Sequence, residues 1–204
     1  MPNKPTESHE PDGTGRQRVQ LMEAALQLVQ SAGPKAFTLR DVARQAQRTL
    51  EQVQAHFATK EDLLLDILEE GVAHFVGISE EAVAHEGSAL ENLHRLACAY
   101  VDFSLRFPGH FAVLFEPPPE ILEQRPSEPA QRNAFGVLIR CVERAQEEGS
   151  LPEGDPMAFT LPLWAVVHGI ARLAMAGLLR MPRKQLLDFT RRASVHMLRG
   201  MSHQ

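Results

Sequence analysis

Residues 38–60, TLRDVARQAQRTLEQVQAHFATK, contain the starts of three helices. Each start is a threonine followed three positions later by a carboxylate or an amide, so that the hydroxyl can accept from a free helix N–H and the acid or amide can reach back. Only about seven helical residues fit between the first two starts, and an isolated helix of that length is unstable in water. Two short helices joined by a tight turn predict a helix-turn-helix, whose second helix reads the major groove of DNA. The three pairs are Thr38 with Asp41, Thr49 with Gln52, and Thr59 with Asp62.

The composition is that of an ordinary globular protein, with 44% apolar and 23% charged residues in a chain of 204, long enough for one or two domains. Residues 1–15 are polar and rich in proline, glycine and charge, so we expect a disordered arm rather than a signal peptide. Cys98 and Cys141 are far apart without a CxxC pattern, which predicts reduced thiols in the cytoplasm. The chain has no uninterrupted apolar run of about 18 residues, which argues against a membrane span.

The net charge of the whole chain, −5, argues against a nucleic-acid binder, but the distribution of that charge argues for one. Residues 16–60 hold seven basic and three acidic residues, a net charge of +4, whereas the remainder holds 14 basic and 23 acidic residues, a net charge of −9. Charge separated in this way indicates a basic module on an acidic body. An excess of four charges is modest, so we expect few phosphate contacts per subunit.

Apolar residues recur at helical spacing along most of the chain, and no segment has the alternation of a convincing strand. We therefore predict an all-α protein of about nine helices, with a three-helix head at residues 16–60 and a helical body at residues 61–204. Residues 116–129 are rich in proline and predict a loop or a short helical detour. The expected helices begin after Thr38 and Thr49 and otherwise cover about residues 14–31, 59–85, 89–106, 108–115, 130–148, 157–179 and 183–198.

The stretch 157–179 is apolar nearly all round, interrupted by His168 and Arg172. A helix that is apolar on every face must be covered on every face, and one domain of this size covers about half of it. We expect the remainder to form an interface with a second copy, joined by the final helix, so that two recognition helices lie about one DNA turn apart. A central core helix of a monomer is the alternative.

Three segments of the head follow one another in a distinctive order, and a long helical body follows them. They are AALQL at Ala24–Leu28, TLRDVA at Thr38–Ala43, and HFATKEDLL at His56–Leu64. Over about residues 18–68 this order resembles the tetracycline-repressor (TetR) family of bacterial transcriptional regulators. Trp164, His168 and Gly169 are also similar to a Trp-x-x-x-His-Gly signature on the penultimate helix of one subgroup.

The resemblance implies a ligand-responsive repressor in the cytoplasm, binding a roughly palindromic operator in double-stranded DNA. It implies a homodimer formed through the last two helices, and a body that binds an unknown small-molecule inducer. Neither a cofactor, a metal nor a membrane is expected, and the chain is not expected to be an enzyme.

The chain departs from the family where specificity is set. The turn between the two short helices, usually Ala-Gly-Val-Ser, is A-Q-R-T here, so Gln47 must adopt a strained conformation or the turn must change. Gln54 stands where the family commonly has a phosphate-binding tyrosine, and Leu50 stands where a basic residue is frequent. Glu51 adds an acid that faces the DNA. All of these departures weaken the expected attraction to phosphate.

Each candidate side chain of the head can have either a role in DNA binding or a role in the structure of the head alone. Either Gln52 or Gln54 can read adenine, or both can lie on a solvated polar face. Arginines and the helix starts can grip phosphate, although the threonines are caps first and Arg44 can pair with Asp41. The predicted DNA-binding residues are Arg16, Arg18, Thr38, Arg40, Arg48, Thr49, Leu50, Glu51, Gln52, Gln54, His56 and Lys60.

Aromatic residues of the body are numerous enough to line the effector pocket that the resemblance implies, although core packing explains most of them. His168 and Arg172 are the polar groups most suited to meet a ligand, or they can hydrogen-bond across the dimer. The predicted pocket residues are Phe103, Phe107, Phe111, Phe115, Phe135, Trp164, His168 and Arg172.

Two rival functions remain at this point. The chain has no Gly-rich phosphate loop, GxSxG, HExxH or prominent carboxylate pair, which lowers the case for a helical enzyme. A TetR-like helical dimer that has lost DNA binding and acts as a ligand- or protein-binding module is the stronger rival, because of Gln47, Glu51 and Gln54. His94 and Cys98 share a helical face, but two ligands without a third make a weak metal site.

Overall fold

The computed structural model describes residues 13–84, 86–124 and 130–201, and within these ranges it consists of ten α-helices without a strand. The all-α prediction is confirmed. The helix beyond the expected nine is α7, which occupies the proline-rich segment left open as a loop or a short helical detour. The helices are α1 (Gly13–Ala32), α2 (Leu39–Gln45), α3 (Leu50–Gln54), α4 (Lys60–Val83), α5 (Ala89–Arg106), α6 (Pro108–Phe115), α7 (Pro119–Gln124), α8 (Ala130–Glu147), α9 (Met157–Met175) and α10 (Arg183–Met201).

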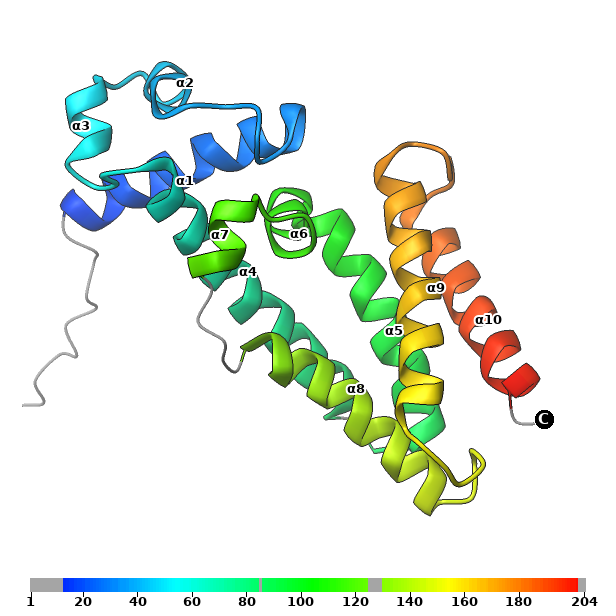
Figure 1. Ribbon diagram of the computed structural model, residues 1–204. Coiled ribbons are helices and arrows are strands. Elements are labelled where there is room, and N and C mark those ends of the chain that lie inside the picture. Colours follow the sequence, from blue (N-terminus) through cyan, green and yellow to red (C-terminus); the bar gives the residue numbers. More distant parts are fainter. Residues whose placement is uncertain (1–12, 85, 125–129, 202–204) are drawn as a thin grey trace, which may run out of the picture.

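The first three helices form a head at one end of the molecule, and α4 leads from it along the body (Figure 1). Each short helix is held by apolar side chains that turn inward: Val42 of α2 and Val53 of α3 are fully buried, and Phe57 closes the base. Helix α1 supplies the other wall with Leu21 and Ala25. Burial of this kind stabilises the head because neither α2 nor α3 is long enough to persist alone.

All three predicted capping boxes are present. The Thr38 N–H donates to Asp41 Oδ2 at 2.9 Å, and the Asp41 N–H donates back to Thr38 Oγ1 at 3.4 Å. The other two boxes repeat this exchange at the starts of α3 and α4. Each box satisfies helix N–H groups that would otherwise lack a partner, an effect typically of about 1 kcal/mol per cap.

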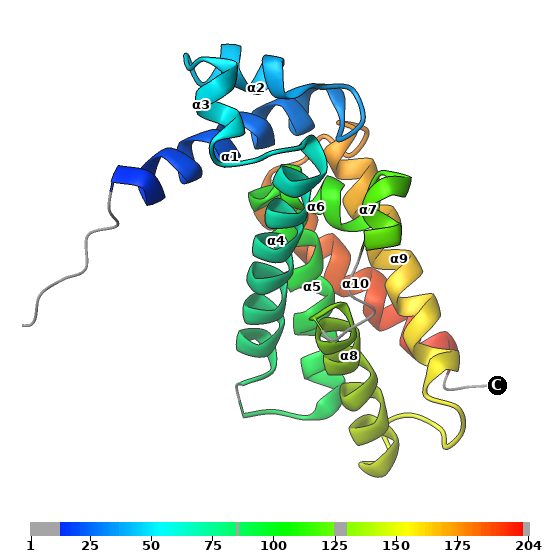
Figure 2. The same cartoon turned by 60° about the vertical axis from the view of Figure 1, so that its left-hand side comes forward.

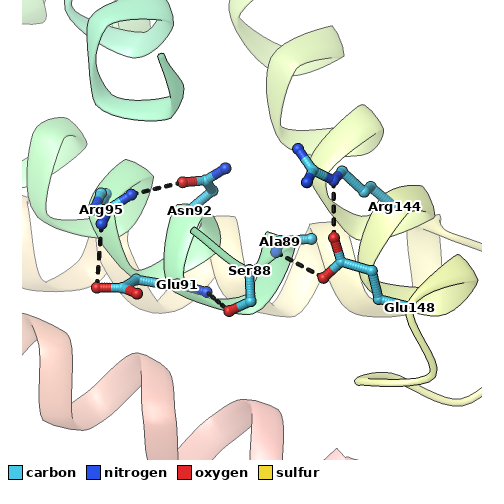
Figure 3. A network of polar contacts seen from close by, with 7 residues as sticks. All are labelled: Ser88, Ala89, Glu91, Asn92, Arg95, Arg144 and Glu148. Carbon is cyan, nitrogen blue, oxygen red and sulfur yellow. Dashed lines mark hydrogen bonds and ion pairs between the residues drawn. The ribbon is translucent and has the colours of Figure 1, made fainter. Parts of the chain in front are cut away.

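Helix α5 is the central element of the body, with α4, α8, α9 and α10 packed around it (Figures 1 and 2). Its N-terminus is fixed by polar contacts to its own first turn and to the end of α8 (Figure 3). Ser88 Oγ accepts from the Glu91 N–H at 3.2 Å, and Glu148 Oε2 accepts from the Ala89 N–H at 2.9 Å. Arg144 holds Glu148 in place with a further contact of 2.9 Å. These contacts fix the lower end of α5 against α8.

Helix α9 is only partly covered by its own chain. Leu163, Val167 and Ile170 are buried against the body, whereas Leu161 and Leu173 are 46% and 44% exposed. Leu178, in the turn that follows, is 70% exposed, and Phe189 on α10 is 36% exposed. Helix α9 is long and apolar enough to cross a membrane, but core helices of soluble proteins can have the same length and composition. The two C-terminal helices therefore share an incompletely covered apolar flank.

Residues 1–12, most of the predicted arm, lie outside the described residues, and α1 already begins at Gly13. The arm expected at residues 1–15 therefore overlaps the first turn of α1. At the far side of the head, α6 rests directly on α1. A Cβ atom built on Gly109 would lie 2.8 Å from Leu26 Cδ2 and 3.1 Å from the Leu26 carbonyl oxygen. The head and the body thus touch at a point where no side chain fits.

Replacement of Gly109 by alanine should destabilise the protein by about 1–3 kcal/mol, because the added methyl group meets backbone as well as a side chain. Urea unfolding followed by circular dichroism at fixed protein concentration measures this. Gly77→Ala is the matched control, since a Cβ at this exposed site on α4 meets nothing within 4 Å. Alanine there should stabilise by about 0.5–1 kcal/mol through helix propensity. Equal effects of the two substitutions would contradict the close contact.

Candidate nucleic-acid interface

The turn between α2 and α3 is tight and strained at one residue. Gln47 has φ 55°, the one positive value of a non-glycine residue in the part of the chain that the structure describes. The turn is closed by the Arg48 N–H, which donates to the Ala43 carbonyl at 2.8 Å. A left-handed conformation costs an L-residue about 1–2 kcal/mol. Of the two outcomes predicted for Gln47, the strained conformation is the one observed.

Helix α3 lies on the surface of the head with its polar side chains outward. Val53 is its buried residue and Leu50 is partly buried, whereas Glu51, Gln52 and Gln54 are exposed. Thr49, at the cap, is exposed as well. An outward helix at the edge of the head is what a major-groove reader requires.

The two glutamines of α3 differ in what they can offer. Gln52 Oε1 accepts from the Thr49 N–H at 2.9 Å and so completes the cap of its own helix. Gln54 makes no side-chain hydrogen bond among the described residues. Because bidentate reading of adenine uses both the oxygen and the nitrogen of an amide, Gln54 is the freer of the two.

Three arginines of the head are exposed: Arg16 on α1, Arg40 on α2, and Arg48 in the turn before α3. Arg16 and Arg40 are exposed and form no ion pair within the described ranges. Arg48 is exposed, and its guanidinium donates to Gln20 Oε1 at 3.3 Å. Arg44 instead pairs with Asp41 at 3.3 Å, which was one of the two readings for that side chain. The hydrogen bonds from Thr38 hold the pKa of Asp41 below its usual value, so this acid stays charged within the basic surface.

Two cations that were predicted to face DNA form contacts with other residues of the chain. Arg18 pairs with Asp66 of α4, lies 4.6 Å from the centre of the Phe57 ring, and donates to the His56 carbonyl at 3.3 Å. Lys60 lies 4.5 Å from the centre of the Phe37 ring, and its amine donates to the Lys35 carbonyl at 3.1 Å. Partial burial lowers the pKa of Lys60. Both cations join the head to the start of α4, a structural role that the sequence pattern did not reveal.

His56 also contacts another residue of the head. Its Nε2 lies 3.4 Å from Gln17 Oε1 of α1. The ring is partly buried at the end of α3, so it faces α1 rather than standing free on the surface.

The body holds a continuous aromatic cluster between α4, α5, α6 and α9. Phe103 and Phe111 have no exposed surface, which places them in the core rather than on the wall of a pocket. Tyr100, which the sequence analysis overlooked, joins them, and its hydroxyl lies 2.8 Å from His168 Nδ1. Phe115 lies edge-on to His168 at 5.6 Å between ring centroids. The partly buried members around His168 are the ones that a ligand could reach.

Polar groups at the edge of this cluster are paired within one chain. Arg172 forms an ion pair of 2.7 Å with Glu116, the residue that ends α6. Burial and the nearby Arg172 lower the pKa of His168, so its imidazole is neutral at pH 7 and can accept from the Tyr100 hydroxyl. Burial also raises the pKa of Tyr100, which keeps its proton. Trp164 lies 5.8 Å from His168 and 6.0 Å from Phe135, between ring centroids.

His94 and Cys98, which share a face of α5, each contact α10. His94 Nδ1 lies 2.8 Å from Ser194 Oγ, and the Cys98 thiol donates to the Leu187 carbonyl at 3.5 Å. Both residues are used to hold α5 against α10. Burial raises the pKa of Cys98 and of Cys141, and both thiols are free.

Comparison with protein families decides the identity of this fold. Residues 21–67 match the model described as bacterial regulatory proteins, tetR family. Residues 93–196, just over half of the chain, match the model described as tetracyclin repressor-like, C-terminal domain. The chain belongs to the TetR family.

Solved structures share this fold over almost the whole length of the chain. A protein with unknown function from Rhodococcus sp. RHA1 is 27% identical with a TM-score of 0.72, covering 95% of this chain and 100% of its own. The TetR regulator PfmR from Thermus thermophilus is 18% identical with a TM-score of 0.73, covering 89% and 95%. AibR, solved in complex with isovaleryl coenzyme A and operator DNA, is 15% identical with a TM-score of 0.71, covering 86% and 96%. No curated protein matches the chain significantly.

Glycine at position 47, the residue usual for this turn in TetR proteins, should stabilise the protein by up to about 1 kcal/mol. The left-handed conformation would cease to be strained, partly offset by the greater freedom of glycine in the unfolded chain. Gln30→Gly, at an exposed helical site in α1, should instead destabilise by about 0.5–1 kcal/mol. Urea unfolding of both variants tests this, and a loss of stability in Gln47→Gly would show that the turn is not under strain.

Proposed function

We propose that this TetR-family chain is a repressor that binds a roughly palindromic operator as a homodimer in the cytoplasm and is released by a small-molecule inducer. The observation that carries the proposal is the exposed polar face of α3, a capped helix of five residues that follows a tight turn with Gln47 in the left-handed conformation. Only Val53 of this helix is fully buried, so packing does not explain its exposed polar side chains.

Docking on DNA would divide the head into two groups of side chains. Arg16, Arg40 and Arg48 are exposed and would contact phosphates, which supply affinity without sequence information. Gln54 would read a base edge in the major groove, whereas Gln52 would stay paired with Thr49 in the capping box of α3. Glu51 lies on the same exposed face and would repel phosphate, so the operator must place a base or water there.

A homodimer would cover the apolar flank of α9 and α10. Leu161, Leu173, Leu178 and Phe189 are four of the five large exposed apolar side chains in the part of the chain that the structure describes. Their burial against the same residues of a second copy would satisfy the two-fold symmetry of a palindromic site. Small side chains are also exposed on α9, at Ala158 and Ala165, and just beyond its end, at Ala176. They would let the two copies approach closely.

The effector would enter between α6, α8 and α9, where Phe115, Trp164 and His168 are partly buried. These side chains fit a small molecule with an apolar body and a polar group able to meet His168 or Arg172. AibR, whose structure contains isovaleryl coenzyme A, shows that this fold admits an acyl compound. An anionic effector would compete with Glu116 for Arg172 and so loosen the link between α6 and α9. Release from DNA requires that the effector bind one arrangement of the heads better than the other.

A mobility-shift titration with DNA from upstream of the chain's own gene tests the proposal. We expect a shift that weakens as salt is added, because phosphate contacts release counterions. Arg48→Ala should weaken binding to all sequences and lower the salt slope by about 2 for a dimer that loses one contact in each subunit. Gln54→Ala should instead relax the preference at one base position of each half-site.

Arg199→Ala is the control for charge, since Arg199 is exposed in the last turn of α10. The C-terminal end of this helix lies far from the head (Figure 1). This variant should leave the salt slope unchanged. Absence of any shift at low salt would favour the rival function, a TetR-like dimer that binds only a ligand or a protein.

A further inference from the structure

We propose that Glu70, His74 and His110 form a binding site for one divalent transition-metal ion, with Zn²⁺ the best match. The three residues are brought together by α4 and α6 close to the head, at the edge of the aromatic cluster of the body, where His74 and His110 contact Phe107. The site is additional to the proposed function, and its occupation does not depend on DNA binding.

Each residue offers one ligand atom, and the three atoms all lie within 4.8 Å of one another. His110 Nε2 lies 3.0 Å from Glu70 Oε2, and His74 Nε2 lies 3.8 Å from Glu70 Oε1. Ligand atoms around a tetrahedral Zn²⁺ are about 3.3 Å apart, given bonds of about 2.0–2.1 Å. A small rotation of His74, whose side chain is 42% exposed, would bring the set to that spacing.

The frame around the ligands is rigid where a metal site needs it to be. Glu70 and His74 are four residues apart on one face of α4. The His74 ring stacks on Phe107 with centroids 4.7 Å apart, and the His110 ring is buried. Gly71 gives His110 its place, because a Cβ on residue 71 would lie 3.0 Å from His110 Cβ. The buried His110 ring is already held in place, so that His74 is the ring that metal binding must reorient.

The donor set selects the class of ion. Two imidazoles and one carboxylate, with a fourth position open to water, are a known zinc set, and imidazole also suits Ni²⁺, Co²⁺ and Cu²⁺. Mg²⁺ and Ca²⁺ prefer oxygen ligands and should bind poorly. The hydrogen bond to Glu70 is enough to explain why His110 is buried. It does not account for His74, whose Nε2 converges on the same carboxylate from a second position.

The site lies where the head rests on the body. His110 directly follows Gly109, the point at which α6 touches Leu26 of α1, and α4 is the helix that leaves the head. A metal ion bound to both α4 and α6 would fix the direction in which the head leaves the body. Any effect on operator affinity rests on the proposed function, whereas metal binding can be measured without DNA.

Calorimetric titration of the untagged, chelator-treated full chain with Zn²⁺ tests the site. We expect one ion per chain, and a rise in Tm of about 5–10 °C when free Zn²⁺ is about 100 times Kd. Co²⁺ should give the visible absorption of a four-coordinate site. Glu70→Gln with His74→Gln should weaken the affinity at least about tenfold. Both side chains are substantially exposed, so this variant should still fold, which its circular dichroism without metal checks.

Glu69→Gln with His196→Gln is the matched control, because it removes one exposed acid on α4 and one exposed histidine on α10. This variant should bind Zn²⁺ as the unaltered chain does. Absence of stoichiometric binding, or equal binding by the two double variants, would overturn the proposal and leave an ordinary hydrogen bond between His110 and Glu70.

Discussion

Two helices of seven and five residues must be held in a fixed relation although neither can persist in water alone. The rest of the molecule depends on this constraint. Threonine caps satisfy the free N–H groups at their starts, and Val42, Val53 and Phe57 bury one face of the pair against α1. The other face is released from packing, so its side chains are available for a partner. The polar surface of α3 follows from the way the head is stabilised.

Two cations link this small head to α4. Arg18 reaches from α1 to Asp66, and Lys60 reaches back from α4 to Lys35 and Phe37. A shift of α4 would therefore carry the head with it. Helix α6 touches α1 on one side and carries Glu116 of the Arg172 ion pair on the other. The proposed effector site and the proposed DNA-binding face are thus joined through α4 and α6, the helices that also share Glu70, His74 and His110.

The sequence predicts best those features whose partners lie close along the chain. The three capping boxes join residues three apart and could be foreseen, and the strain at Gln47 was one of the two outcomes that the missing glycine predicted. The roles of Arg18 and Lys60 could not, because their partners Asp66 and Lys35 lie far away along the chain and helical periodicity does not fix such distances. Tyr100 was overlooked for the same reason, since its partner His168 lies on another helix. Glu70 and His74 share a face visible in the sequence, but the third ligand arrives only when α6 packs on α4.

Hydroxyl-radical footprinting of the chain on its own upstream DNA at low salt measures the central claim most directly, since it reports both the docking of α3 and the number of heads. We expect two protected stretches on one face of the duplex, with centres about 10 base pairs or slightly more apart. Uniform cleavage at every protein concentration, or a single protected stretch, would contradict a paired molecule that reads DNA through α3.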